Sequence, residues 1–186
     1  MSVHTTPHAA VVAVIDFWFD KVGQSRWFAK DAALDADIAR RFGRLRDAVL
    51  ASEADGWREA PEPLMAAIIL LDQFSRNIHR DSAQAFAADP LARELAMQSL
   101  DEGWTNAAPV AWRQFLLMPL MHSEALADQQ CCLIEFERLG NDTLTGFARR
   151  HHDQIASFGR FPGRNAALGR RTTAAEQAAL DSGAAF

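Results

Sequence analysis

The sequence of 186 residues contains no tyrosine, two cysteines, ten glycines and seven prolines. So little glycine and proline, without a short repeat, excludes collagen-like and low-complexity architectures. Cys131 and Cys132 are adjacent, and because neighbouring cysteines rarely form an unstrained disulfide we expect a reducing compartment. The longest apolar run, residues 64–71, is far shorter than the roughly 20 residues that a transmembrane helix needs.

Positive charge is also limited. The formal net charge is −5, whereas a general nucleic-acid-binding protein presents a basic face. The apolar run of residues 11–15 reaches Asp16 too early to be the core of a signal peptide. We therefore expect a soluble, cytoplasmic protein with neither a nucleic-acid nor a membrane partner; the sequence gives no indication of its oligomeric state.

Composition and length indicate one globular domain. Hydrophobic residues make up 49% of the chain and charged residues 23%, as in ordinary globular domains. A chain of 186 residues leaves little room for a second core. We expect a single helical domain over residues 1–186, in which residues 1–8 form a flexible tail and residues 172–186 form a short C-terminal helix and tail.

The fold class expected from local signals is all-α. Alanine is nearly a fifth of the residues, β-branched residues are scarce, and no segment alternates with a period of two residues, so helices are favoured over strands. Start and stop signals predict seven to eight helices in an antiparallel array. Their expected ranges are residues 9–19, 31–52, 61–79, 89–103, 109–119, 124–139 and 141–158, with a last short helix beginning at a capping box formed by Thr173 and Glu176.

The third of these helices is the most informative segment. Residues 64–71 are apolar on all sides, which is typical of a central, buried helix. The helix continues directly into polar residues, and at 100° per residue these fall together on one side. Two interpretations stay open: the segment is a solvated helix end, or it places a polar cluster in an interior cleft, where charges must be paired or bound. The residues concerned are Asp72, Arg76, His79 and Arg80, with Gln73 and Asn77 beside them.

A second polar group follows Pro119, which is expected to kink or end the fifth helix. This places His122, Ser123 and Glu124 at a helix junction. Ser123 is a suitable cap for the next helix, with Glu124 favoured by the helix dipole. Alternatively, the spacing of His122 and Glu124 suits two metal ligands.

His151 is expected in the middle of the apolar face of the seventh helix. A histidine in this position is either a core residue whose ring is hydrogen-bonded or a ligand-binding group. In both cases we expect it to be largely buried and hydrogen-bonded to a polar side chain or a backbone carbonyl.

The loop over residues 158–171 combines glycines, prolines and aromatic rings with four arginines, Arg160, Arg164, Arg170 and Arg171. Exposed backbone amides and planar guanidinium groups suit a carboxylate or a phosphate. The alternative is that these arginines cap helix carbonyls and pair with Asp72 or Glu124.

These segments together resemble the bacterial family DUF924, a domain of unknown function. The resemblance rests on the motifs LDQFSRNIHR at residues 71–80, FLLMPLMHSE at 115–124 and FGRFPGRNAALGR at 158–170, on IDFWF at 15–19 followed by WF at 27–28, and on His151. It implies an all-α fold similar to tetratricopeptide-repeat superhelices and no established activity. One position departs from the family pattern: Gly163 stands where the family usually has histidine.

The resemblance also implies a set of characteristic residues, which we take as the candidate site. Candidate catalytic residues are His122, Glu124, Asp72 and His151. Candidate ligand-binding residues are Gln73, Arg76, Asn77, Ser123, Arg160, Arg164, Asn165 and Arg170.

Three functions fit these residues, and the sequence does not decide whether the protein is an enzyme. The first is a pocket that binds an anionic small molecule, because the arginines near the candidate site outnumber Asp72 and Glu124 and buried excess charge is costly. The second is an interaction module whose groove binds an acidic or C-terminal peptide. The third is a metal-dependent hydrolase. We expect no cofactor or bound metal.

If the distant segments form one site, Arg76 and at least one of Arg160, Arg164 and Arg170 face the same cavity as His122.

Overall fold

The computed structural model describes residues 7–185, and every regular element in this range is a helix. Two long helices change type along their length. The first joins α1 (Pro7–Ile15) to a π-helical segment, Asp16–Val22; the second joins α3 (Pro61–Ile68), a π-helical segment, Ile69–Phe74, and α4 (Ser75–Ile78). Counted as continuous helices, the described range holds nine, eight of them with at least seven residues.

The other regular elements of the described range are helices too. The all-α prediction is therefore confirmed. The remaining α-helices are α2 (Ala32–Ala51), α5 (Asp89–Asp101), α6 (Trp104–Ala107), α7 (Val110–Met121), α8 (Leu126–Arg138), α9 (Asp142–Phe158) and α10 (Ala174–Asp181), and the 3-10 turns are Ala83–Phe86 and Pro162–Arg164.

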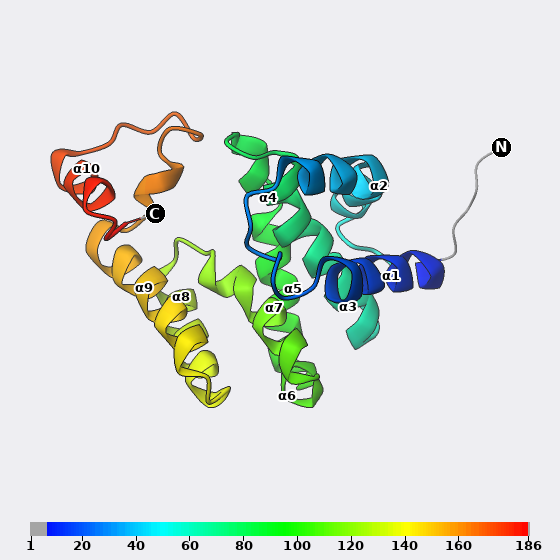
Figure 1. Ribbon diagram of the computed structural model, residues 1–186. Helices are drawn as coiled ribbons and strands as arrows, with labels where there is room; N and C mark the ends of the chain where they lie inside the picture. The colour runs from blue at the N-terminus through cyan, green and yellow to red at the C-terminus, as the bar shows by residue number, and fades with distance from the viewer. Residues whose placement is uncertain (1–6, 186) are drawn as a thin grey trace.

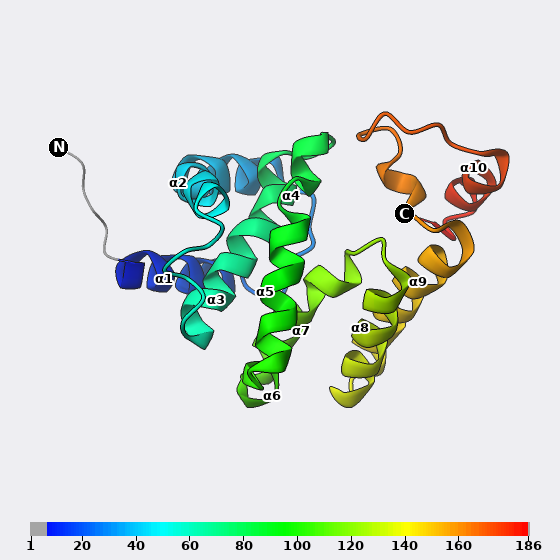
Figure 2. The ribbon, with the colours of Figure 1, turned by 180° about the vertical axis from the view of Figure 1, so that it is seen from behind.

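The helices form two groups (Figures 1 and 2). α1 to α7 pack together on one side, while α8 and α9 lie side by side and α10 lies near the end of α9. The continuous α3–α4 helix contacts α1, α2, α5 and α7. The segment between α9 and α10 extends back toward the end of α4 in both views, so the last part of the chain reaches the first group of helices.

The central position of the third predicted helix is confirmed. The side chains from Leu64 to Leu71 are fully buried, and burial of each large apolar side chain stabilises the fold by about 1.5–3 kcal/mol. Asp72 and Gln73 follow this run and are buried as well. Both residues belong to the π-helical segment. Because π-helical turns often occur at functional sites, this end of the helix is a candidate position for a functional site.

Local signals located most helix ends. Asp31 caps α2, with its carboxylate accepting hydrogen bonds from the backbone of Ala33 and Leu34 at 3.0 Å, and both halves of the capping box at Thr173 and Glu176 are present. The short helix α6 was not predicted. Pro119 lies inside α7, which ends two residues later at Met121.

One prediction of local structure is wrong. Residues 7 and 8 belong to α1 and not to a tail; the rest of the predicted tail, residues 1–6, lies outside the described residues. Burial and the charge of Arg46 in α2 lower the pKa of His79.

No helix in the described range is both long enough and apolar enough to span a membrane. Cys131 and Cys132 are free thiols. Cys132 is fully buried in the core, and this burial raises its pKa, so Cys132 packs as a small apolar core residue.

Candidate functional site

A cavity of about 440 Å³ lies where the two groups of helices meet. Its lining comes from the loop before α2, from the end of the α3–α4 helix, and from α7, α8 and α9. The polar lining residues are Gln73, Arg76, Asn77, Arg80, His122, Arg150 and His151, and the others are Trp27, Phe28, Ala29, Met118, Met121, Phe136, Leu144 and Phe147.

The end of the buried helix supplies most of the polar lining. Gln73, Arg76, Asn77 and Arg80 are spaced by three and four residues, so they form a stripe along one helical face. Asp72 is behind this stripe and only 1% of its side chain is exposed. The interpretation of this segment as a polar cluster in an interior cleft therefore holds, and the solvated helix end does not.

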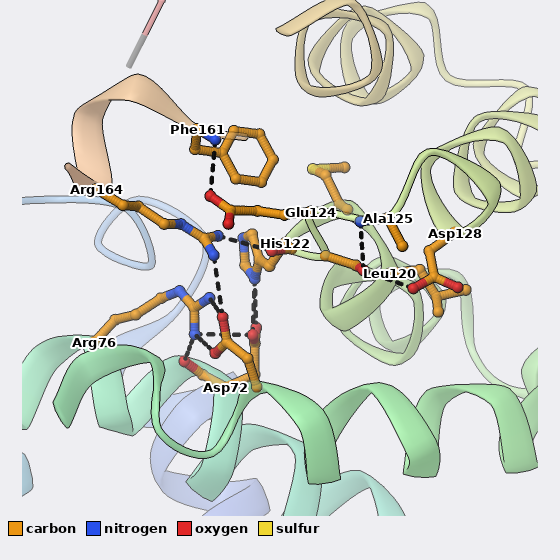
Figure 3. Close-up of polar contacts among 12 residues, drawn as sticks. Asp72, Arg76, Leu120, His122, Glu124, Ala125, Asp128, Phe161 and Arg164 are labelled. Atoms are coloured by element: carbon orange, nitrogen blue, oxygen red, sulfur yellow. Dashed lines mark hydrogen bonds and ion pairs between the residues drawn. The ribbon is translucent and has the colours of Figure 1, made fainter. Parts of the chain in front are cut away.

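Asp72 and His122 form the centre of the polar cluster (Figure 3). His122 follows α7, and its Nδ1 lies 2.7 and 3.0 Å from the two carboxylate oxygens of Asp72. Gln73 Nε2 donates to the same carboxylate at 2.6 Å, and Arg76 Nη1 lies 3.0 Å from it. The carboxylate is thus surrounded by donors, which a buried charge requires.

The pKa values of this pair move in the same direction for different reasons. Burial alone raises the pKa of Asp72, but the Arg76 charge and the hydrogen bonds from His122 and Gln73 outweigh it and hold that pKa below its usual range. Burial lowers the pKa of His122, with the Asp72 charge opposing and the charges of Arg76 and Arg164 adding to the shift. At neutral pH the arrangement is an ionised Asp72 that accepts a hydrogen bond from a neutral His122.

Asp89 joins the stripe to the last loop. Its carboxylate accepts two hydrogen bonds from Arg76, both at 3.0 Å, and one from Arg164 at 3.3 Å. Arg164 also donates to the His122 carbonyl at 2.8 Å, as Figure 3 shows. The sequence predicts Asp89 as the N-cap of α5, but it is the first residue of the helix and its side chain makes no cap hydrogen bond; the two arginines bind it instead.

Arg80 has its own acidic partner. Its guanidinium donates to both carboxylate oxygens of Asp35 in α2 at 2.8 and 2.9 Å, and Asn77 donates to the same carboxylate at 2.7 Å. Asp35 does not line the cavity, so it balances the charge of Arg80 from behind while Arg80 itself remains in the lining.

The other arginines of the last loop hold the chain end in place. Arg170 donates to both carboxylate oxygens of Glu124 at 2.7 and 3.0 Å, and the backbone N–H of Phe161 donates to Glu124 at 2.8 Å. Arg160 donates to both oxygens of Glu176 at 2.6 and 2.9 Å.

Two expectations about these residues are therefore wrong. The prediction that one of Arg160, Arg164 and Arg170 faces the same cavity as His122 fails, because all three bind carboxylates outside the lining. Ser123 and Asn165 do not line the cavity either. The predicted excess of charge on Arg76, Arg80, Arg160, Arg164 and Arg170 fails too. Asp35, Asp89 and Glu176, all distant in sequence from the arginines that they bind, restore the balance.

His151 lies in the wall of the cavity and is half-buried. Its Nδ1 donates to the Phe147 carbonyl at 2.8 Å, so the predicted hydrogen bond to a backbone carbonyl is present. Its ring centroid is 6.1 Å from that of His122. Burial, with the neighbouring His122 as a further cause, lowers the pKa of His151 to about 3, so His151 is neutral at physiological pH.

The junction after α7 is built by side chains outside the cavity. Ser123 donates to Asp128 at 2.6 Å, and the fully buried Gln129 donates to the carbonyls of Met121 and Ser123 at 2.6 Å each. These bonds satisfy carbonyls that the helix end leaves free. The prediction that Ser123 caps the next helix is wrong, because the N-cap of α8 is Ala125 and no side chain caps it; Ser123 instead accepts a hydrogen bond from the Ala125 backbone at 3.2 Å.

Comparison with known proteins agrees with this architecture. The family model described as "Bacterial protein of unknown function (DUF924)" matches residues 14–184. The chain belongs to the DUF924 family. Among solved structures, the protein of unknown function ATU0120 from Agrobacterium tumefaciens is similar, with 38% identity over 95% of this chain and 99% of that chain and a TM-score of 0.90. No curated protein matches this chain.

In this DUF924 protein, no three or more His, Cys, Asp or Glu side chains within residues 7–185 are arranged to hold a metal ion. Glu124, one of the ligands that the sequence suggested, is bound to Arg170 and the Phe161 backbone. Gly163, where the resemblance implies a histidine, is exposed and outside the cavity lining.

Sequence reasoning missed several residues of the site. Arg150 and Phe147 come from the exposed side of α9, and Trp27 and Phe28 come from a loop. Trp27 and Phe28 do have a signal in the sequence, because this aromatic pair follows the IDFWF motif at residues 15–19 in the resemblance to the family. Phe28 is 63% exposed and Phe147 is 43% exposed, and both rings line the same cavity.

Proposed function

We propose that the cavity binds a small anion that carries an apolar group. The observation that carries this proposal is the charge of the lining: its three charged residues, Arg76, Arg80 and Arg150, are arginines, and no carboxylate lines it. Arginine offers a planar pair of donors that fits a carboxylate or a phosphate, and such charge-assisted bonds are about twice as strong as neutral ones.

Arg150 is the lining residue best suited to bind the anion. Arg76 and Arg80 are held by Asp89 and Asp35, so much of their charge is already neutralised. Arg150 lies over the Phe147 ring, with its Cζ 4.6 Å from the ring centroid, and forms no ion pair with any residue in the described range. Its guanidinium therefore supplies a net positive charge to the cavity.

The rest of the lining favours an apolar group on the same ligand. About half of the lining residues are aromatic, methionine and leucine side chains, and the polar residues lie at the end of the α3–α4 helix, after α7 and on α9. An apolar wall with a few convergent polar groups is the usual composition of a small-molecule site. An aryl or alkyl carboxylate matches both parts.

Thermal unfolding with matched probes tests this proposal. Hexanoate and benzoate supply an anion with an apolar group, hexylamine replaces the anion with a cation, and hexanol has no charge. A ligand at 100 times its Kd adds about 2.7 kcal/mol to the unfolding free energy, which for a chain of this length raises Tm by about 5–10 °C. We expect the two carboxylates to raise Tm and the other two probes to leave it unchanged.

The paired variants Arg150→Ala and Arg149→Ala control this measurement. The two residues are adjacent on α9 and both exposed, but Arg149 pairs with Glu137 and does not line the cavity. We expect Arg150→Ala to lose most of the carboxylate effect and Arg149→Ala to keep it. Equal responses in the two variants, or stabilisation by hexylamine equal to that by hexanoate, would contradict the proposal. Arg76→Ala is less suitable because Arg76 also holds Asp72 and Asp89.

An acidic or carboxylate-terminal peptide is the second candidate ligand, in the way that tetratricopeptide-like helical arrays bind peptides. The exposure of Phe28 and Phe147 at the cavity favours it, because a ligand longer than the cavity would cover both rings. A hydrophobic tripeptide with a free C-terminus, compared with its C-terminal amide, distinguishes the two cases: if the free acid stabilises the protein more than hexanoate does, the peptide is the better ligand.

A further inference from the structure

The side chain of His122 is oriented for proton transfer. Its Nδ1 faces the buried Asp72 carboxylate at 2.7 and 3.0 Å, and an ionised carboxylate only accepts hydrogen bonds, so Nδ1 carries the ring proton of the neutral imidazole. The other ring nitrogen, Nε2, is then unprotonated. Figure 3 shows this nitrogen on the side of the ring turned away from Asp72, and it forms no hydrogen bond within residues 7–185.

The position of His122 makes this nitrogen accessible to a ligand. His122 lines the cavity and 17% of its side chain is exposed, whereas Asp72 is not in the lining. Burial of the carboxylate behind the ring fixes the tautomer and the ring orientation, which is what a carboxylate partner does for a histidine base. A histidine that served only to pair with Asp72 has no structural need to expose its second nitrogen to a cavity.

We propose that the cavity is an active site for ester hydrolysis, in which His122 is the general base, Asp72 is its positioning residue, and the substrate is an ester that carries a carboxylate. This inference rests on the proposed function, because it places the anion of the substrate at the cavity arginines. The co-reactant is water, which enters from the solvent.

The step balances with these groups alone. Nε2 of His122 accepts a proton from a water molecule as the water oxygen forms a bond to the ester carbonyl carbon. The carbonyl π electrons move to its oxygen, and Nη1 of Arg80, which the ion pair with Asp35 leaves unused, can donate a hydrogen bond to that oxyanion. The C–O bond to the leaving group then breaks, and the proton on Nε2 passes to the leaving oxygen.

The first test measures the tautomer of His122 without any substrate. Two-dimensional NMR of the imidazole nitrogens in the full-length protein, assigned with His122→Asn, reports which nitrogen is protonated. We expect Nδ1 to be protonated and Nε2 unprotonated at neutral pH. A proton on Nε2, or a doubly protonated ring at neutral pH, would overturn the proposal.

The second test uses two ester probes, 4-nitrophenyl hydrogen glutarate, which carries a carboxylate, and 4-nitrophenyl butyrate, which does not. Because general-base catalysis contributes about 100-fold or more, we expect His122→Asn to lower kcat for the glutarate half-ester by about 100-fold. His152→Asn is the matched control, since His152 is outside the lining and pairs with the neighbouring Asp153; its kcat remains that of the wild type. Equal rates in the two variants would refute His122 as the base.

The positioning role of Asp72 has its own measurement. The Asp72 charge raises the pKa of His122, so Asp72→Asn moves the acidic limb of the pH–rate profile to lower pH while it lowers the plateau. A loss of rate without movement of the limb would assign Asp72 a structural role only. If Asp72→Asn does not fold, the His122→Asn comparison still decides the proposal.

The two proposals fail in different ways. Binding of hexanoate and benzoate without His122-dependent hydrolysis of either ester would leave the anion site in place and overturn the catalytic inference. A different outcome is hydrolysis that depends on His122 but is equally efficient for both esters, with a KM that Arg150→Ala does not change. That outcome would support His122 as the general base and overturn the proposed anion site.

Discussion

Asp72 makes more polar contacts with the cavity residues than any of its neighbours on the buried helix. It accepts hydrogen bonds from His122 and Gln73 and pairs with Arg76 while its own side chain is almost fully buried. A buried carboxylate without these donors would be strongly unfavourable. Its position directly after a run of fully buried apolar residues therefore requires the partners that the rest of the chain provides.

Replacement of Asp72 tests how much these partners depend on it. Asp72→Asn leaves Arg76 without part of its countercharge, and breaking a buried ion pair typically costs about 3–5 kcal/mol. We expect a loss of about 3 kcal/mol in the free energy of unfolding, measured by urea denaturation at neutral pH. Asp37→Asn is the control: Asp37 pairs with Arg40 and Arg41 at the surface, and such pairs contribute about 0–1 kcal/mol. Similar losses of unfolding free energy in both variants would show that Asp72 does not form the buried ion pair with Arg76 that the structure indicates.

At the scale of the elements, the junction between α7 and α8 depends on the side chain of Gln129, which no sequence motif indicated. Gln129 is fully buried and reaches back to the carbonyls of Met121 and Ser123. It thereby fixes the turn that carries His122. A helix end in the interior needs such a donor, because water does not reach its free carbonyls.

Gln129→Ala removes this donor and leaves the two carbonyls unsatisfied. An unsatisfied buried polar group costs about 1–3 kcal/mol, so we expect a loss of about that size in urea denaturation. Gln130→Ala changes the neighbouring, exposed residue, and we expect it to alter stability by less than about 0.5 kcal/mol. A result in which the two variants are equally stable would contradict the role assigned to Gln129.

The docking of α10 depends on pH through Glu176. Hydrogen bonds from Arg160 and from the Thr173 backbone lower the pKa of Glu176 from 4.5 to about 2. A carboxyl group whose pKa is lower in the folded state stabilises the fold above its unfolded pKa, and this contribution is lost as pH falls through the folded pKa. The contribution of Glu176 is therefore complete above about pH 4.5 and disappears between about pH 4.5 and about pH 2.

Glu176→Gln isolates this contribution. We expect the variant to be less stable than the wild type at neutral pH, and the difference to shrink as the pH approaches 2, because the wild-type carboxyl is then protonated too. Thermal unfolding followed by circular dichroism over this pH range gives the comparison. A difference that stays constant with pH would mean that the charge of Glu176 is not what holds α10.

At the scale of the whole molecule, the cavity depends on the contact between the two groups of helices. The loop after α9 bridges them through Arg164, which reaches Asp89 and the His122 carbonyl, and through Arg170, which reaches Glu124. Figures 1 and 2 show this segment extending from the α9–α10 group toward the end of α4. These ion pairs position the chain end beside the site, although their arginines are not in its lining.

Glu124→Gln weakens one of these links. Glu124 then loses its charge toward Arg170, and we expect faster amide hydrogen exchange over residues 159–173 with little change in the core helix of residues 64–71. Glu137→Gln is the control, because Glu137 pairs with Arg149 at the surface, away from this loop. Unchanged exchange in the loop of the Glu124 variant would show that the contact does not hold it.

Patterns in the amino-acid sequence predicted the fold class, most helix ends and the position of the buried helix. These follow from local chemistry: caps such as Asp31 and Thr173 act within a few residues, and an apolar run such as residues 64–71 has to be buried wherever the chain places it. The polar residues after that run were located for the same reason, since their helical spacing is local as well.

The tertiary structure decided which of these residues share a cavity. Each candidate arginine could pair with any acid in the chain, and Asp35, Asp89 and Glu176 were assigned only when folding brought them within hydrogen-bond distance. Spacing along one helix cannot report contacts between helices. The cavity itself joins residues 27 to 151 across four helices and a loop, so its aromatic wall and the unpaired Arg150 exist as a site only in the packed molecule.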